Sequence, residues 1–144
     1  MFGRERLETK TLDQVRAMRA PGLVVGECLA MLAGAVAPGM TTLGLDALAE
    51  TFIRDHGGRP SFAEVPGYRH TLCTSVNEEI VHGIPGARVL APGDLLSIDC
   101  GAIVGGWHGD AAISLIVGGR DAGSPDDLAL MDATQDSLWA GIGA

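Results

Sequence analysis

The sequence has few basic residues, few cysteines and few aromatic residues. Its 144 residues hold 10 Lys and Arg against 18 Asp and Glu, for a formal net charge of −8. Binding to a phosphate backbone needs a basic surface, so we expect no nucleic-acid partner. Cys28, Cys73 and Cys100 are odd in number, widely spaced and without a Cys-x-x-Cys pair. This set indicates no disulfide framework and predicts a reduced protein of the cytoplasm.

The sequence also lacks a convincing targeting or membrane-spanning segment. Its opening, MFGRERLETK, is charged and no apolar core follows it, so we expect no signal peptide. The most apolar stretch, residues 21–40, contains Glu27 and is largely Ala and Gly. A spanning helix needs about 20 strongly apolar residues, so we expect a buried helix of a soluble protein and no membrane partner.

What is present is the material for one packed domain over residues 1–144, with 47% hydrophobic residues and 21 glycines. Apolar spacing predicts helices over residues 12–20 and 23–36, separated by Pro21 and Gly22. A third helix is predicted from Thr42, as its N-cap, to the Gly57-Gly58 pair.

The remainder of the chain is predicted to be mostly strand. The expected strands are residues 71–76, 94–104 and 107–117, with a weaker one over 78–86 that breaks at Gly83. Ser124 and Pro125 have the features of a helix start. Because helices come first, then strands, then one helix, the fold class is α+β, with helices packed on an antiparallel sheet.

Alternation in the two clearest strands predicts a hairpin. Two apolar rows are visible: Leu96, Ile98, Cys100 and Ala102, then Ala111, Ile113, Leu115 and Val117. Both rows face one core only if the connection has an even length, such as a two-residue turn at Val104-Gly105 or Gly105-Gly106. Asp99 and Asp110 must then share the opposite face, either directly paired or diagonal.

Two carboxylates so placed repel each other unless a positive charge lies between them. Gly101 and Ala112 on the same face leave room for a divalent metal ion, or for two. A shared proton, or exposure to solvent without any role, is the alternative. The small and otherwise nearly uncharged face favours the metal.

Two motifs carry a resemblance to a known family. TSVNEEIVHGIP, followed by GDLLSIDCGAIVGGWHGDAAISLIVG, resembles type I methionine aminopeptidase. VAPGMTTLGLDALAE and GGRPSF upstream fit the same family, so the resemblance runs from about residue 12 to the last residue. It implies the N-terminal half of a pita-bread fold, in which two related α+β halves surround a site for two divalent metal ions (Co, Mn, Fe or Zn).

The resemblance implies an activity and a role for five residues. The family removes the initiator methionine from nascent polypeptides in the cytoplasm, which makes these peptides, and the ribosome, expected partners. Asp99 and Asp110 match metal ligands, with Asp110 bridging both ions. His82 matches a catalytic histidine that binds the substrate near the scissile amide, and Tyr68 and Cys73 match the methionine pocket.

The resemblance also implies what is missing. The family's other ligands, one His and two Glu, lie in the second half with a second substrate His and the general-base Glu. We therefore expect a truncated domain that is inactive alone and self-associates. The alternatives are a non-catalytic pita-bread binding protein, or another pita-bread hydrolase such as a proline-specific aminopeptidase. His56 and His70 are expected in solvated loops, Glu78 and Glu79 at the surface, and His108 beside Asp110 in a secondary role.

Overall fold

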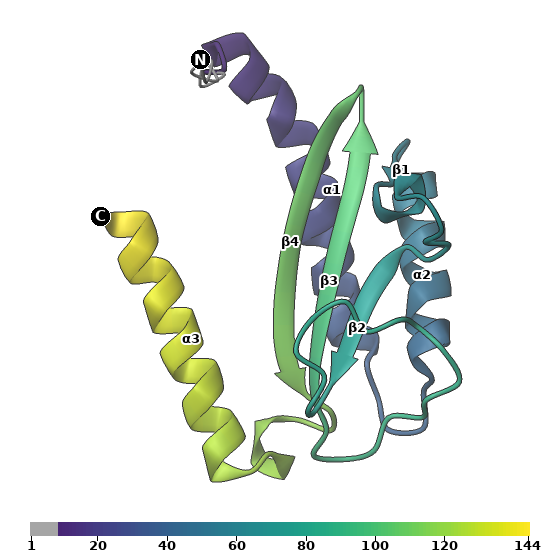
Figure 1. The fold of residues 1–144 in the computed structure, drawn as a ribbon, viewed down its shortest axis with the longest axis vertical. Coiled ribbons are helices and arrows are strands. Elements are labelled where there is room, and N and C mark those ends of the chain that lie inside the picture. Colours follow the sequence, from purple (N-terminus) through teal and green to yellow (C-terminus); the bar gives the residue numbers. More distant parts are fainter. Residues whose placement is uncertain (1–8) are drawn as a thin grey trace, which may run out of the picture.

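A computed structural model describes residues 9–144 and shows two helices against an antiparallel sheet, with a third helix standing apart (Figure 1). The long strand β3 is central: β4 pairs with one edge, and β2 and the short β1 pair with the other. The α+β prediction is confirmed. The elements are α1 (Leu12–Ala35), α2 (Thr42–Asp55), β1 (Arg59–Pro60), β2 (Leu72–Val76), β3 (Leu95–Val104), β4 (Trp107–Ile116) and α3 (Pro125–Gly143), with short 3-10 helices at Phe62–Glu64 and Arg120–Ala122.

The core lies between the sheet and the helices α1 and α2. The predicted inner row of β3 is fully buried, whereas the row on β4 is less so: Ala111 is exposed, and Ile113 and Leu115 are half-buried. β4 borders solvent along its free side, which explains the difference. The principal core residues are Val25, Cys28, Leu29, Leu32, Leu45, Ala49, Ile53, Leu72, Val76, Leu90, Leu96, Ile98, Cys100, Ala102 and Val117.

The predicted break between two N-terminal helices is wrong, because α1 is one helix that contains Pro21. Pro21 is buried, and its backbone contacts Gly109 of β4 so closely that a Cβ at Gly109 would lie 2.5 Å from the Pro21 carbonyl carbon. Proline removes one hydrogen bond from a helix interior. Packing on the sheet holds the two halves of α1 in line despite that loss.

Helix α1 is also long and apolar enough to cross a membrane, by length and composition alone. In the structure, Val25, Cys28, Leu29 and Leu32 of α1 pack into the core against β3 and β4. The apolar character of α1 is therefore accounted for by the face that it buries, as the sequence predicted for residues 21–40.

The segment over residues 78–86 was predicted as a weak strand, and this prediction is wrong. Asn77 and His82 have φ values of 58° and 57°, in the left-handed region that an extended strand does not contain. Ile80, Val81 and Ile84 favour strands by propensity, but they are 67–89% exposed and have no strand opposite them. Residues 77–88, here called the His82 loop, run irregularly beside β2.

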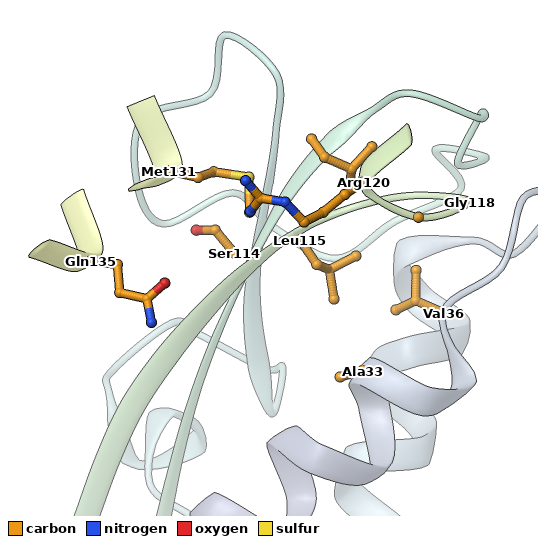
Figure 2. Close-up of a pocket in the computed structure, with 10 residues that line it drawn as sticks. Ala33, Val36, Ser114, Leu115, Gly118, Arg120, Met131 and Gln135 are labelled. Atoms are coloured by element: carbon orange, nitrogen blue, oxygen red, sulfur yellow. The ribbon is translucent and has the colours of Figure 1, made fainter. Parts of the chain in front are cut away.

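Helix α3 begins as predicted: the Ser124 side chain accepts a hydrogen bond from the Asp127 amide, and Pro125 is the first helical residue. None of its residues is buried. Arg120 Nη2 donates to both carboxylate oxygens of Asp132, at 2.9 and 3.0 Å, and this ion pair joins α3 to the short helix at Arg120–Ala122. An open pocket of about 460 Å³ separates its Met131 and Gln135 from Val36 and Leu115 (Figure 2).

Candidate metal centre

The hairpin of β3 and β4 turns at Gly105 and Gly106, which confirms one of the two predicted turns. Val104 pairs with Trp107, and the two glycines have φ values of 59° and 82°. Positive φ at both central positions is the geometry of a type I′ turn, whose twist suits an antiparallel hairpin. The two-residue connection sets the register of every pair below it.

In that register, Asp99 and Asp110 lie diagonally on one face. Asp99 is opposite Ala112, and Asp110 is opposite Gly101. A 2.7 Å hydrogen bond between the Ser97 and Ser114 hydroxyls, further along the same face, agrees with this placement. The sequence prediction that the core pattern brings the two acids to one face is confirmed.

Burial and mutual repulsion act on the two carboxylates. Burial raises the pKa of Asp99, and the adjacent Asp110 carboxylate raises it further. The imidazole of His82 acts in the opposite direction on the Asp99 pKa, but to a smaller extent. Asp110 itself is exposed. Two oxygen ligands held together at an electrostatic cost fit a hard divalent cation, which would remove that cost.

Cys73 and Tyr68 adjoin the carboxylates from strand β2 and the loop before it. Cys73 is paired with Asp99 in the sheet register, so their side chains share a face. The Tyr68 hydroxyl donates to the Leu72 carbonyl at 2.6 Å and lies 3.3 Å from the Cys73 sulfur. Burial is the main cause that raises the pKa of both the Tyr68 phenol and the Cys73 thiol, so each is neutral at pH 7.

His82 is exposed, and the backbone around it is held against β2. The Gly83 carbonyl accepts from the Thr74 amide at 2.8 Å, and the Gly83 amide donates to the Ser75 hydroxyl at 3.1 Å. A Cβ at Gly83 would collide with the Thr74 carbonyl. Glycine is therefore required immediately after His82, because only glycine lets the loop approach the strand so closely.

Within residues 9–144, no cluster of three or more His, Cys, Asp or Glu side chains has the arrangement of a metal site. The structure places Cys73, Asp99 and Asp110 on one face of the sheet, with the Tyr68 hydroxyl beside Cys73, and leaves the His82 side chain exposed on the neighbouring loop. His108 lies exposed on the same face as Asp110.

The prediction of a solvated His70 is wrong. Its Nδ1 lies 3.1 Å from Asp46 Oδ2, and its side chain is only 25% exposed. Sequence reasoning missed Asp46, which is buried on α2. A signal was available, because Asp46 falls among the buried positions of that helix, between Leu45 and Ala49, where an acid needs partners.

Three comparisons place the chain among known proteins. The model of the family described as metallopeptidase family M24 matches residues 16–144. The chain is 50% identical over 143 residues to methionine aminopeptidase 1 of Mycobacterium tuberculosis, covering 99% of this chain and 53% of that one. It is 44% identical to methionine aminopeptidase 1 of Bacillus subtilis, covering 92% and 52%.

The fold agrees with these relatives. The solved methionine aminopeptidase of Rickettsia prowazekii superposes with a TM-score of 0.90 at 31% identity, over 95% of this chain and 54% of that one. The chain spans about half the length of the curated relatives it matches. The predicted pita-bread architecture and the predicted resemblance are confirmed, and the chain belongs to metallopeptidase family M24.

Proposed function

We propose that this chain supplies one half of the site of a metal-dependent aminopeptidase that removes the N-terminal methionine of nascent polypeptides in the cytoplasm. The observation that carries the proposal is the diagonal pair Asp99 and Asp110 on the outer face of the hairpin, with Cys73 opposite Asp99 on β2. The relatives named methionine aminopeptidase support the choice of substrate.

In this proposal, each described residue has its own task. Asp99 and Asp110 would be ligands of two divalent metal ions, and Asp110 would serve both of them. The ions, when bound, supply the Lewis acidity that activates water and the scissile carbonyl. His82 donates a hydrogen bond near the scissile amide, and Tyr68 and Cys73, both neutral, form one wall of the pocket for the methionine side chain. The remaining ligands and the general base come from outside residues 9–144.

The first test is metal binding by the 144-residue chain. Calorimetric titration with Mn²⁺ is expected to give weak binding, with a Kd on the order of 10⁻⁴–10⁻³ M, because two carboxylates form an incomplete shell. Asp110→Asn should abolish it. Asp136→Asn removes the same charge from exposed α3 and serves as the matched control. Equal binding by Asp110→Asn and the control would contradict the assigned role.

The second test is catalysis in a chimera, in which these residues replace the matching part of the M. tuberculosis relative. With Mn²⁺ or Co²⁺, the chimera should release methionine from the peptide Met-Ala-Ser. Asp110→Asn should eliminate that activity. His82→Ala should lower kcat by about 10²–10³-fold and leave metal affinity unchanged, since it removes a hydrogen bond to developing charge. An equal loss of metal affinity would make His82 a ligand instead.

A further part of the proposal is that the isolated chain self-associates and cleaves nothing. Leu130, Leu138 and Trp139 of α3 are 58–61% exposed and line a groove of about 790 Å³ that also includes Ile80. An apolar surface of this kind favours association with a second copy. The free edge of β4 offers a second copy unpaired backbone groups as well.

A further inference from the structure

We propose that Thr42 and Asp46, one turn apart on helix α2, are positioning residues that together hold two loops of the candidate site in register. The loops are the His82 loop and the Tyr68 loop, defined here as residues 65–71. The inference rests on the proposed function for its meaning, but its geometry stands on contacts of residues 9–144. Neither residue belongs to the five already assigned to the site.

Thr42 holds the His82 loop at its far end. Its side chain is 2% exposed, and its hydroxyl both accepts from the Gly86 amide at 2.9 Å and donates to the Gly86 carbonyl at 3.1 Å. The amide of Leu43 also donates to the Gly86 carbonyl, at 2.9 Å, and the Thr42 amide donates to the Arg88 carbonyl at 3.1 Å. The first amides of a helix lack intrahelical partners, and here the loop supplies them.

This use of Thr42 corrects the prediction that it caps the helix. Thr41 is the N-cap, since its hydroxyl accepts from the Gly44 amide at 3.1 Å. The two adjacent threonines therefore have different roles. Thr41 accepts a hydrogen bond from an amide of the first turn of α2, and Thr42 bonds the backbone of the His82 loop. A capping role alone would not require Thr42 to be buried against residues 44 positions away in the chain.

Asp46 holds the Tyr68 loop where it enters β2. It is 6% exposed, and its Oδ1 accepts from the amides of Thr71 and Leu72, both at 2.8 Å. Its Oδ2 meets His70 Nδ1 at 3.1 Å. The carbonyl of the same Leu72 accepts from the Tyr68 hydroxyl. Asp46 thus acts on Tyr68 and Cys73 through the main chain of β2, since its bonds go to the amides of Thr71 and Leu72.

The two residues are four positions apart and lie on one face of α2, so a single rigid element sets both loops. α2 is itself fixed in the core by Leu45, Ala49 and Ile53. A buried carboxylate and a buried hydroxyl are costly unless they are hydrogen-bonded. Among residues 9–144, their partners are the backbone of Thr71, Leu72 and Gly86 and the side chain of His70. The position of the His82 loop relative to Tyr68 and Cys73 therefore depends on α2, because α2 is bonded to both loops.

The test is hydrogen exchange of the 144-residue chain, followed by mass spectrometry. Thr42→Val keeps the shape of the side chain and removes its hydroxyl, together with both hydrogen bonds of that hydroxyl to Gly86. Exchange in residues 82–88 should therefore rise by at least about tenfold. Thr42→Ser should restore the wild-type rate. Asp46→Asn should raise exchange in residues 68–73. The matched controls on the same helix are Thr51→Val and Glu50→Gln, whose side chains bond only within α2 at the surface.

A second readout is the rate at which iodoacetamide alkylates Cys73. Asp46→Asn should raise this rate severalfold, whereas Cys28 and Cys100, which are fully buried, should remain unreactive in the same sample. In the chimera, Thr42→Val and Asp46→Asn should raise KM for the peptide more than they lower kcat, with Mn²⁺ affinity unchanged.

Three results would overturn the inference: equal increases throughout β3 and β4, which would mean global destabilisation; Thr42→Ser behaving like Thr42→Val; or no difference between Thr42→Val and Thr51→Val. The exchange and alkylation readouts need no catalysis. A chimera that is inactive with its wild-type sequence would therefore contradict the proposed function alone, while the loop measurements would still decide on Thr42 and Asp46.

Discussion

The layer formed by α1, α2 and the sheet differs from α3 in how its apolar residues are used. In the layer, Leu32 and Ile98 are fully buried, and the backbones of α1 and β4 touch at Gly109. In α3, Leu138 and Trp139 are about three-fifths exposed although the helix has a good cap and a first-turn proline. Local signals are therefore enough to define a helix, whereas its packing needs a surface that the layer does not provide.

The largest difference should appear when core and α3 leucines are truncated. Leu32→Ala leaves a cavity in the core and should lower the free energy of unfolding by about 2–5 kcal/mol. Leu130→Ala removes a side chain that is 59% exposed and should change the free energy of unfolding by no more than about 0.5 kcal/mol. Urea unfolding followed by circular dichroism measures both. Similar losses would mean that α3 is packed in solution.

Two glycines test the same comparison by adding a methyl group. Gly109→Ala should cost about 1–3 kcal/mol, because its Cβ would lie 2.5 Å from the backbone of Pro21. Gly141→Ala in α3 meets nothing within 4 Å and should favour the helix by roughly 0.5–1 kcal/mol. Urea unfolding of the first variant and far-ultraviolet dichroism of the second are the measurements. A Gly109→Ala variant as stable as the wild type would refute the close contact.

Self-association should depend on α3 and not on the layer. Trp139→Ser combined with Leu138→Ser should reduce the average mass measured by size-exclusion chromatography with light scattering, because it removes apolar surface from the groove. The unfolding midpoint in urea at low protein concentration should stay unchanged. Val65→Ser, at a loop residue 55% exposed, is the control that should leave the mass as it was.

The smallest expected effect is on acid stability. Hydrogen bonds from the Ala91 amide and the Asn77 side chain hold the pKa of Asp94 below its usual value. A carboxyl with a lowered folded-state pKa contributes stability above its unfolded value, near pH 4, and loses it as the pH falls through the folded value. Asp94→Asn should flatten the stability curve below about pH 4. A curve for Asp94→Asn identical to that of the wild type would contradict the assignment.

The parts that sequence reasoning predicted correctly depend on neighbours close along the chain. The Gly105-Gly106 turn and the alternation around Asp99 and Asp110 define the register of the hairpin without help from the remainder of the molecule. Ser124 and Pro125 define the start of α3 in the same way. For the hairpin, the prediction and the structure agree because the alternation of apolar residues and the two-residue turn are enough to determine which residues of β3 and β4 are paired.

The parts that it predicted wrongly depend on contacts between distant residues. Pro21 continues a helix because it packs on Gly109, which its own neighbours do not indicate. Thr42 bonds Gly86, and Asp46 bonds His70, 44 and 24 positions away. Periodicity and capping rules consider only residues that are close in the sequence, so they do not predict hydrogen bonds at these separations. Strand alternation identified Asp99 and Asp110, and motif resemblance identified Tyr68, Cys73 and His82. Neither identified Thr42 and Asp46, which hold the two loops.

The short hairpin connection has a consequence for the order of folding. Asp99 and Asp110 are 11 positions apart, whereas Thr42 and Gly86 are 44 positions apart. Each doubling of loop length adds about 0.6 kcal/mol to the entropy of closure, so two doublings place the second contact roughly 1.2 kcal/mol behind. A hairpin forms in about 1–10 μs. Interactions within the hairpin accelerate folding only if the hairpin belongs to the folding nucleus, and otherwise they slow unfolding; the refolding rate of a Gly105→Ala variant distinguishes the two.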